Sequence, residues 1–216
     1  MRQSGITGLE TAIILIAFVV VASVFAFTVL SVGIFSSERS KETIHEGVEE
    51  TQSTLAPRGS TIALTGDVAG TTSVTKVKFT LGAAGEAGDR IDLTPPYLYD
   101  DTGTDPDASG LESPATVSYN DSRQHKSAAR WTVEFIGGSN GDYVLDTGET
   151  AEITVWLHEY TVGTDSYALG AETNEFLATR LGVNDQFSVE FDAGSGATIQ
   201  LQRTVPPRLT PVVNLR

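Results

Sequence analysis

The sequence contains no cysteine among its 216 residues, and this absence excludes two kinds of stabilising chemistry. A chain without thiols forms no disulfide framework and binds neither zinc nor an iron–sulfur cluster through thiolates. A folded domain must therefore depend on its hydrophobic core or on assembly with other chains. The part of the chain after Pro57, about 160 residues, is long enough to bury such a core.

Basic residues are scarce as well. Lys and Arg number 14 against 28 Asp and Glu, which gives a formal net charge of −14. Of these, 27 acidic and 13 basic residues lie at or after Glu38, so the acidic excess belongs to the part that follows the N-terminal segment. Such a surface repels phosphate backbones and anionic lipid. We therefore predict no nucleic-acid partner.

Charge is missing altogether from residues 11–37, which are mostly apolar. At about 1.5 Å per residue, a helix of this length reaches about 40 Å and can cross a bilayer. The apolar region of a secretory signal is shorter, follows a basic stretch and ends in a small-residue cleavage site. The run is therefore predicted to stay on the mature protein and to hold its precursor in the cytoplasmic membrane.

A single acid, Glu10, lies directly before this run. A carboxylate at the edge of a membrane helix is unfavourable unless a counter-charge meets it. Cleavage between Gly5 and Ile6 would create an amino group on Ile6, which could pair with Glu10 of a neighbouring subunit and set the axial register of a helical filament. The alternative is an ordinary single-span anchor with Glu10 at the headgroup boundary.

The N-terminal residues resemble the class III, prepilin-like signal and core helix of archaellins (archaeal flagellins) and archaeal type IV-like pilins. The residues that carry the resemblance are Gly5, Gly8, Glu10 and the run Ala12–Ala22. One departure is that Gln3 and Ser4 stand before the cleavage position, where the family usually has Lys or Arg. The resemblance implies a signal peptide over residues 1–5, removed by a prepilin or archaellin peptidase, and an assembly role for Gly8 and Glu10.

The helix is predicted to continue beyond the apolar run and to cover residues 6–56. Glutamates recur every four residues in one row, at Glu38, Glu42, Glu46 and Glu50. Ile44, Val48 and Leu55 fall on the opposite side of such a helix. Pro57 is predicted to end it, because the residue before a proline disfavours the helical conformation.

From Thr61 onward the apolar residues alternate with polar ones, the pattern of half-buried strands. The clear strand candidates are 77–81, 131–135, 153–157, 187–191 and 199–201, and the weaker ones are 62–64, 91–93, 115–119 and 212–215. Many short strands without intervening helices favour an antiparallel sandwich or barrel. The predicted class is thus α+β, with a long N-terminal helix followed by an all-β sandwich over residues 57–216.

Three of the strand regions, Val77–Gly82, Trp131–Gly137 and Glu152–Leu157, also resemble the outer domain of archaellins, which is immunoglobulin-like in that family. Residues 94–114 look like an insertion. The resemblance implies a structural subunit of a cell-surface filament, the archaellum. The subunit would polymerise with copies of itself, and a secretion and motor complex would export it and turn the filament for swimming. The alternatives are a type IV-like adhesion pilin and a membrane-tethered ligand-binding module.

No residue pattern supports catalysis or a bound cofactor. Residues 137–141 match G-x-S-x-G, but that motif requires a strand, a sharp turn and a helix, whereas another strand pattern follows here. The three histidines, His45, His125 and His158, have no second histidine at ligand spacing. We therefore predict that the chain is not an enzyme.

Two acidic loops could supply the oxygen ligands that calcium prefers. The first offers Asn140, Asp142, Asp146 and Glu149, and the second offers Asp100, Asp101, Asp105 and Asp107. Acid-rich loops in an acidic protein are more often solvated, and neither loop has the full calcium-loop spacing.

One N-x-S/T sequence, Asn120-Asp121-Ser122, is present and is expected to precede a turn. This motif is the acceptor for N-linked glycans in exported proteins. It predicts that Asn120 is glycosylated.

Overall fold

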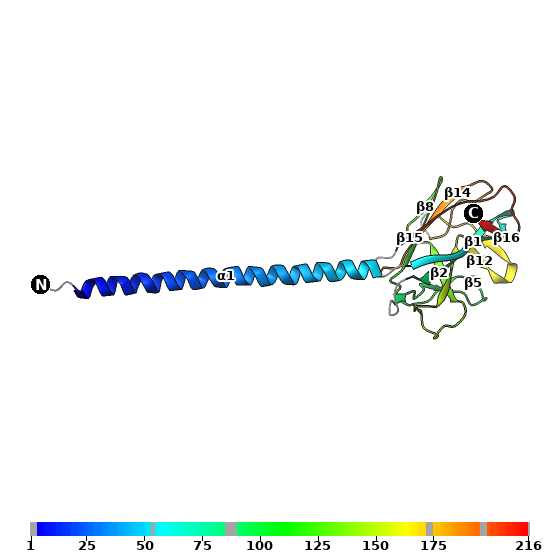
Figure 1. Ribbon diagram of the computed structural model, residues 1–216. Coiled ribbons are helices and arrows are strands. Elements are labelled where there is room, and N and C mark those ends of the chain that lie inside the picture. The colour runs from blue at the N-terminus through cyan, green and yellow to red at the C-terminus, as the bar shows by residue number, and fades with distance from the viewer. Residues whose placement is uncertain (1–3, 53–54, 85–89, 172–174, 195–197, 216) are drawn as a thin grey trace. The chain divides into compact units, whose positions relative to one another are not determined.

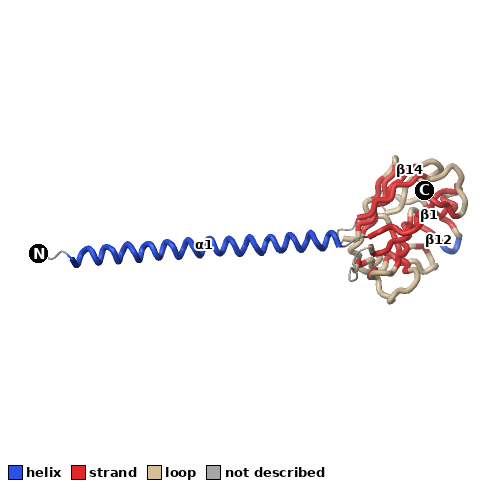
Figure 2. Tube along the Cα trace, in the orientation of Figure 1, coloured by secondary structure: helices blue, strands red, loops and turns tan. Residues whose placement is uncertain are grey.

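The computed structural model describes residues 4–52, 55–84, 90–171, 175–194 and 198–215. The chain divides into two compact units, residues 1–49 and 50–216. The first unit is a helix and the second, the head, is built of strands (Figures 1 and 2). This confirms the predicted α+β class.

Helix α1 spans Ser4–Gln52 without interruption (Figure 1). Its segment Gly8–Lys41 is long and apolar enough to cross a membrane by length and composition, with a mean hydropathy of 3.0 in its most apolar 18-residue window. Two of the hydroxyls in this segment need no water, because Ser23 Oγ and Thr28 Oγ1 donate to the carbonyls of Val20 and Val24 at 2.8 Å. The helical backbone is satisfied internally, as a membrane-spanning segment requires.

The predicted end of the helix, residue 56 with Pro57 as the stop, is wrong. Helix α1 ends at Gln52, and strand β1 (Leu55–Val68) already includes both Leu55 and Pro57. Leu55 is only 7% exposed and pairs with Ala83 of the neighbouring strand, so it belongs to the core of the head and not to a helix face. Burial and sheet pairing outweigh the local helical pattern, which continued by chance for one more turn.

The head contains two main sheets. The larger sheet has the order β5-β12-β13-β1-β2-β11-β9, and β16 also pairs with β1. Its further members are β2 (Thr71–Ala83), β5 (Thr104–Asp105), β9 (Arg130–Phe135), β11 (Thr150–Trp156), β12 (Glu159–Thr161), β13 (Ser166–Ala168) and β16 (Val212–Leu215). The smaller sheet has the order β15-β14-β7-β8, formed by β7 (Thr116–Asp121), β8 (His125–Lys126), β14 (Gln186–Asp192) and β15 (Thr198–Thr204).

Two short strand pairs and one short helix complete the head. Strand β3 (Ile91–Asp92) pairs with β10 (Val144–Leu145), and β4 (Tyr97–Leu98) pairs with β6 (Asp107–Ala108). The 3-10 helix η1 covers Val162–Thr164. Strands β4, β5 and β6 all come from the predicted insertion over residues 94–114, so this segment is part of the folded head.

The two main sheets meet through the inward side chains that the alternation predicted. The ring of Phe191 in β14 lies 6.3 Å from that of Phe79 in β2 and 5.5 Å from that of Trp131 in β9, with nearly perpendicular planes. All three residues are at most 2% exposed. Edge-to-face contacts of this kind add about 0.5–1.5 kcal/mol to the burial of the rings. They join the smaller sheet to the larger one and confirm the predicted sandwich of strands.

The larger sheet departs from an all-antiparallel arrangement at one strand pair. Strand β1 pairs with β13 in parallel, through Val68 and Tyr167. In the neighbouring strand β2, Lys76 Nζ lies 3.6 Å from the ring centroid of Trp156 and 5.3 Å from that of Tyr99 in the insertion. Such cation–π contacts contribute about 0.5–2 kcal/mol and hold the insertion against β2.

Candidate functional site

The outer surface of α1 is the first candidate site, because it exposes an apolar area that water does not tolerate. Leu9, Phe18 and Phe25 are 66%, 72% and 72% exposed, and none of the membrane-length segment is buried inside the structure. A hollow with wholly apolar walls lies along this surface, lined by Phe18, Val21, Ala22, Phe25, Ala26, Val29 and Leu30. A helix that is apolar on all sides needs lipid or other helices around it.

The residues predicted for processing and assembly lie at the start of this helix. Gly5 and Ile6 fall within the bounds of α1, and their side chains lie outside the part of the chain whose surroundings are described. Glu10 is exposed, and a side chain built at Gly8 would meet nothing within 4 Å. Both are thus free to contact another subunit. Cleavage after Gly5 and the pairing of Glu10 stay predictions.

The loop predicted to bind calcium is closed by its own hydrogen bonds. Asn140 and Asp146 both donate their backbone N–H groups to Glu149, at 3.0 Å each. Arg90 lies across the loop, with its guanidinium 3.5 Å from a carboxylate oxygen of Asp142 and 3.0 Å from one of Asp146. Two of the four predicted ligands, Asp142 and Asp146, therefore pair with a guanidinium, and the carboxylates of this loop do not converge as a metal site requires.

Calcium binding by this loop requires Arg90 to move away. We expect millimolar calcium to raise the melting temperature of the Arg90→Ala protein more than that of the wild type, because the variant removes the competing charge. Thermal unfolding with and without calcium measures this, and magnesium is the control ion. If neither protein responds to calcium, the predicted site is disproved.

In the second acidic loop, three carboxylates approach one another. One oxygen each from Asp100, Asp105 and Asp107 lies within 4.8 Å of the others. Asp105 is fully buried, and burial raises the pKa of its carboxyl group above the usual range. The fourth predicted member, Asp101, instead accepts a hydrogen bond from the Tyr99 hydroxyl at 2.8 Å. Only part of the predicted ligand set therefore converges.

The predicted glycosylation site lies at the end of β7, directly before the turn into β8. Asn120 and Ser122 are both exposed, as an acceptor sequence requires. Between them, Asp121 accepts hydrogen bonds from the N–H groups of Arg123 at 2.6 Å and Gln124 at 3.0 Å, which fixes the turn. Burial opposes the ionisation of Asp121, but these bonds and that from the Tyr119 hydroxyl outweigh it and lower the pKa of the carboxyl group.

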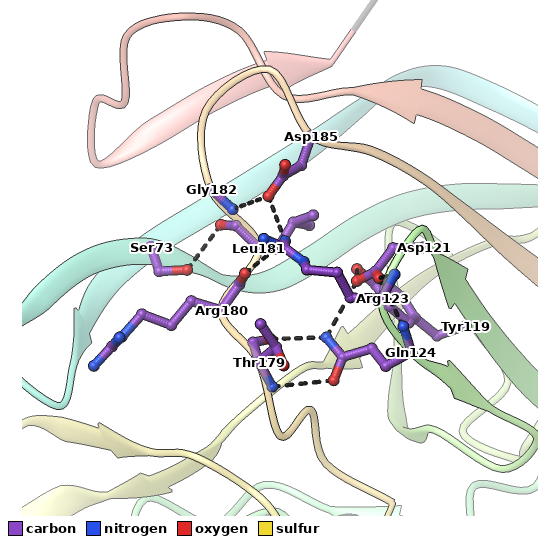
Figure 3. Close-up of polar contacts among 10 residues, drawn as sticks. All are labelled: Ser73, Tyr119, Asp121, Arg123, Gln124, Thr179, Arg180, Leu181, Gly182 and Asp185. Atoms are coloured by element: carbon purple, nitrogen blue, oxygen red, sulfur yellow. Dashed lines mark hydrogen bonds and ion pairs between the residues drawn. The ribbon is translucent and has the colours of Figure 1, made fainter.

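A polar network joins this turn to the segment before β14 (Figure 3). Arg123 donates to the carbonyl of Arg180 at 2.8 Å and forms an ion pair with Asp185 at 2.5 Å. Asp185 also accepts the N–H of Gly182 at 2.7 Å. The sequence did not reveal this network, because its partners lie 57 and 62 positions apart and share no motif.

The Gly-rich stretch that matches G-x-S-x-G forms part of the connection between β9 and β11, which pair directly. Gly137 and Gly141 have φ of 92° and 90°, a backbone conformation that glycine adopts without strain. Ser139 is exposed and its hydroxyl accepts the N–H of Gly141 at 3.1 Å. The turn residues thus account for the motif.

Comparisons with known proteins agree with these observations. The family profile described as archaeal-type flagellin matches residues 5–203. A protein named probable flagellin 1 from Archaeoglobus fulgidus is 32% identical over 99% of this chain and 96% of its own length. Another of that name, from Aeropyrum pernix, is 29% identical over 96% of this chain and 95% of its own.

The fold also has a solved counterpart. The archaeal flagellum of Methanospirillum hungatei contains a subunit that superimposes with a TM-score of 0.54 at 20% identity, covering 96% of this chain and 98% of that one. This likeness concerns the fold. With the family profile matched across both the helix and most of the head, the chain belongs to the archaeal-type flagellins.

Proposed function

We propose that the chain is the structural subunit of an archaellum, a filament on the cell surface that serves swimming motility. The observation that carries this proposal is the long apolar surface of α1, exposed along its whole described length, in a chain of the archaeal-type flagellin family. A polymer of such helices would bury this surface. The acidic head would then form the exterior, where its net negative charge keeps neighbouring filaments apart.

During assembly the helix would leave the lipid of the membrane and enter a bundle of helices in the filament. Lipid tails and a bundle of apolar helices are equally apolar, so a subunit can leave the membrane for the filament at small cost. The Ile6 ammonium of one subunit pairs with Glu10 of the next and fixes the register of the helices. A peptidase that removes residues 1–5 and a membrane complex that exports and turns the filament are the partners that this scheme requires.

The first test is the N-terminal residue of the mature protein. In material sheared from the cell surface, we expect mass spectrometry to find Ile6 as the first residue, because only cleavage after Gly5 creates the ammonium that pairs with Glu10. A chain that keeps Met1 and stays in the membrane fraction would contradict the filament proposal. It would favour the membrane-tethered binding module instead.

An adhesion pilin is the second candidate, since its core helix has the same character. The family match favours the archaellum, because it covers 5–203 and so includes most of the head. Loss of swimming, with surface attachment unchanged, is the phenotype that we expect on deletion of the gene.

A further inference from the structure

The outer face of the smaller sheet is lined by hydrogen-bonding side chains. In β14, Phe187, Val189 and Phe191 point into the core, so the residues between them point outward. Ser188 pairs with Asn120 of β7 on one side and with Gln202 of β15 on the other. These three side chains form a row across three strands, which are spaced about 4.8 Å apart. The row begins at the asparagine of the glycosylation sequence.

At this position the surface is hollowed into a groove of about 370 Å³. Its lining is mostly polar and includes all three residues of the row. The lining residues are Asn120, Asp121, Ser122, Asn184, Asp185, Gln186, Phe187, Ser188 and Gln202. Phe187 is 2% exposed and offers almost no apolar surface. The groove therefore presents amides, hydroxyls and two carboxylates to a ligand.

The wall of the groove is fixed before any ligand arrives. Of the lining residues, Asp185 forms an ion pair with Arg123, and Asp121 holds the turn by accepting backbone N–H groups (Figure 3). Because these contacts lie within the head, ordering the wall costs no free energy at the moment of binding. The same ion pair leaves the Arg123 guanidinium engaged, so the groove has little attraction for an anion.

The chemistry of the lining selects the ligand. An apolar molecule would leave most of the polar lining unpaired, and an anion would meet Asp121 and Asp185. A neutral molecule with many hydroxyls can both donate to and accept from Ser188, Gln186 and Gln202. Sugar residues have this chemistry, and a glycan attached to Asn120 would begin inside the groove.

We propose that the first sugars of an N-linked glycan on Asn120 lie in this groove and hydrogen-bond along the row through Ser188 to Gln202. In the attachment step, the anomeric carbon of an activated glycosyl phosphate breaks its bond to the phosphate oxygen and bonds to Nδ2 of Asn120. The phosphate leaves with the electron pair, and the amide nitrogen loses one proton. The inference rests on the proposed export of the head to the cell exterior.

The test compares glycosylated and unglycosylated chains, each purified at full length in detergent from cells that export it. Ser122→Thr keeps the acceptor sequence and Ser122→Ala removes it, so the difference between their melting temperatures contains the effect of the glycan together with a side-chain contribution that is common to every background. Tryptophan fluorescence follows the head alone, because Trp131 and Trp156 are the only tryptophans in the sequence. We expect a glycan effect of about 3 °C, the size of a few added hydrogen bonds.

The same pair is then measured in two further backgrounds. Gln202→Ala removes a groove residue, and Gln200→Ala removes the same residue type from the same strand, at a position that does not line the groove. We expect the glycan effect to fall to less than half in Gln202→Ala and to persist in Gln200→Ala. An equal effect in both backgrounds would show that the glycan projects freely, and would overturn the proposal.

Mass spectrometry of the wild-type chain provides the remaining outcome. An unmodified Asn120 in chains that still assemble into filaments would overturn the groove proposal and leave the filament function intact. Failure of the filament function appears separately, as the absence of the chain from sheared surface material.

Discussion

Cells that carry Glu10→Ala should accumulate the subunit in the membrane and produce no filaments. In the proposed assembly, the Ile6 ammonium of each subunit is enclosed by apolar helices and has the neighbouring Glu10 as its partner. Removing one member of a buried ion pair costs about 3–5 kcal/mol, and the loss is repeated at every subunit contact. Electron microscopy of sheared material, with immunoblots of the membrane fraction, measures both effects.

Glu38→Ala is the matched control, since Glu38 is an exposed glutamate on the same helix beyond the apolar run. We expect it to assemble normally, because an exposed acid contributes little. Glu10→Gln keeps a hydrogen-bonding side chain but no charge and should also fail. Normal filaments from Glu10→Ala would show that the acid is only a boundary residue of the membrane segment.

Acid should weaken the head through His158. This residue follows β11 and is completely buried, so its imidazole has no contact with water. Burial and the nearby positive charge of Arg180 lower the pKa of the imidazole from 6.5 to about 4. A hydrogen bond with the Ala168 backbone acts in the opposite direction but is weaker. The folded head therefore favours the neutral ring.

The pH range follows from these two pKa values. Above pH 6.5 the imidazole is neutral in both states, and its contribution is fully present. As the pH falls from 6.5 toward 4, the unfolded chain takes up the proton first, so the free energy of unfolding should fall by about 3 kcal/mol. Denaturant unfolding of the head at a series of pH values measures this slope.

Two variants separate His158 from the carboxylates that titrate in the same range. In His158→Leu the slope between pH 6.5 and 4 should become shallower by the contribution of the imidazole, whatever the absolute stability of the variant. In His125→Asn it should match the wild type, because His125 is exposed. A slope as steep in His158→Leu as in the wild type would assign the acid sensitivity to other groups.

Elements in which one physical signal dominates were predictable from the sequence. The uncharged run indicated α1, and strict alternation identified β2, β9, β11, β14 and β15. The longest strand, β1, was predicted only over residues 62–64, because its first residues continue the helical pattern. The short strands β5, β12 and β13 were not predictable, since they show no period and are held by tertiary contacts. His158 illustrates the same limit: its isolation in the sequence said nothing of its complete burial.

The candidate sites also divide into those that could be predicted from the sequence and those that could not. Gly5, Ile6 and Glu10 form a linear motif, and Asn120 to Ser122 is another, so both could be named from the sequence. The closure of the 140–149 loop by Arg90 could not, because a distant cation that competes with calcium leaves no local signal. The groove beside Asn120 depends on the register of three strands, which only the fold determines.

The short passage from α1 to β1 has a mechanical consequence. Only two residues separate Gln52 from Leu55, so tension along the helix enters the head at the first residue of a strand. Strand β1 pairs with β2 at eleven positions and with the C-terminal strand β16 at four. Force that reaches β1 is therefore shared with both neighbouring strands. In the proposed filament, the head would thus resist being torn from its shaft as a unit.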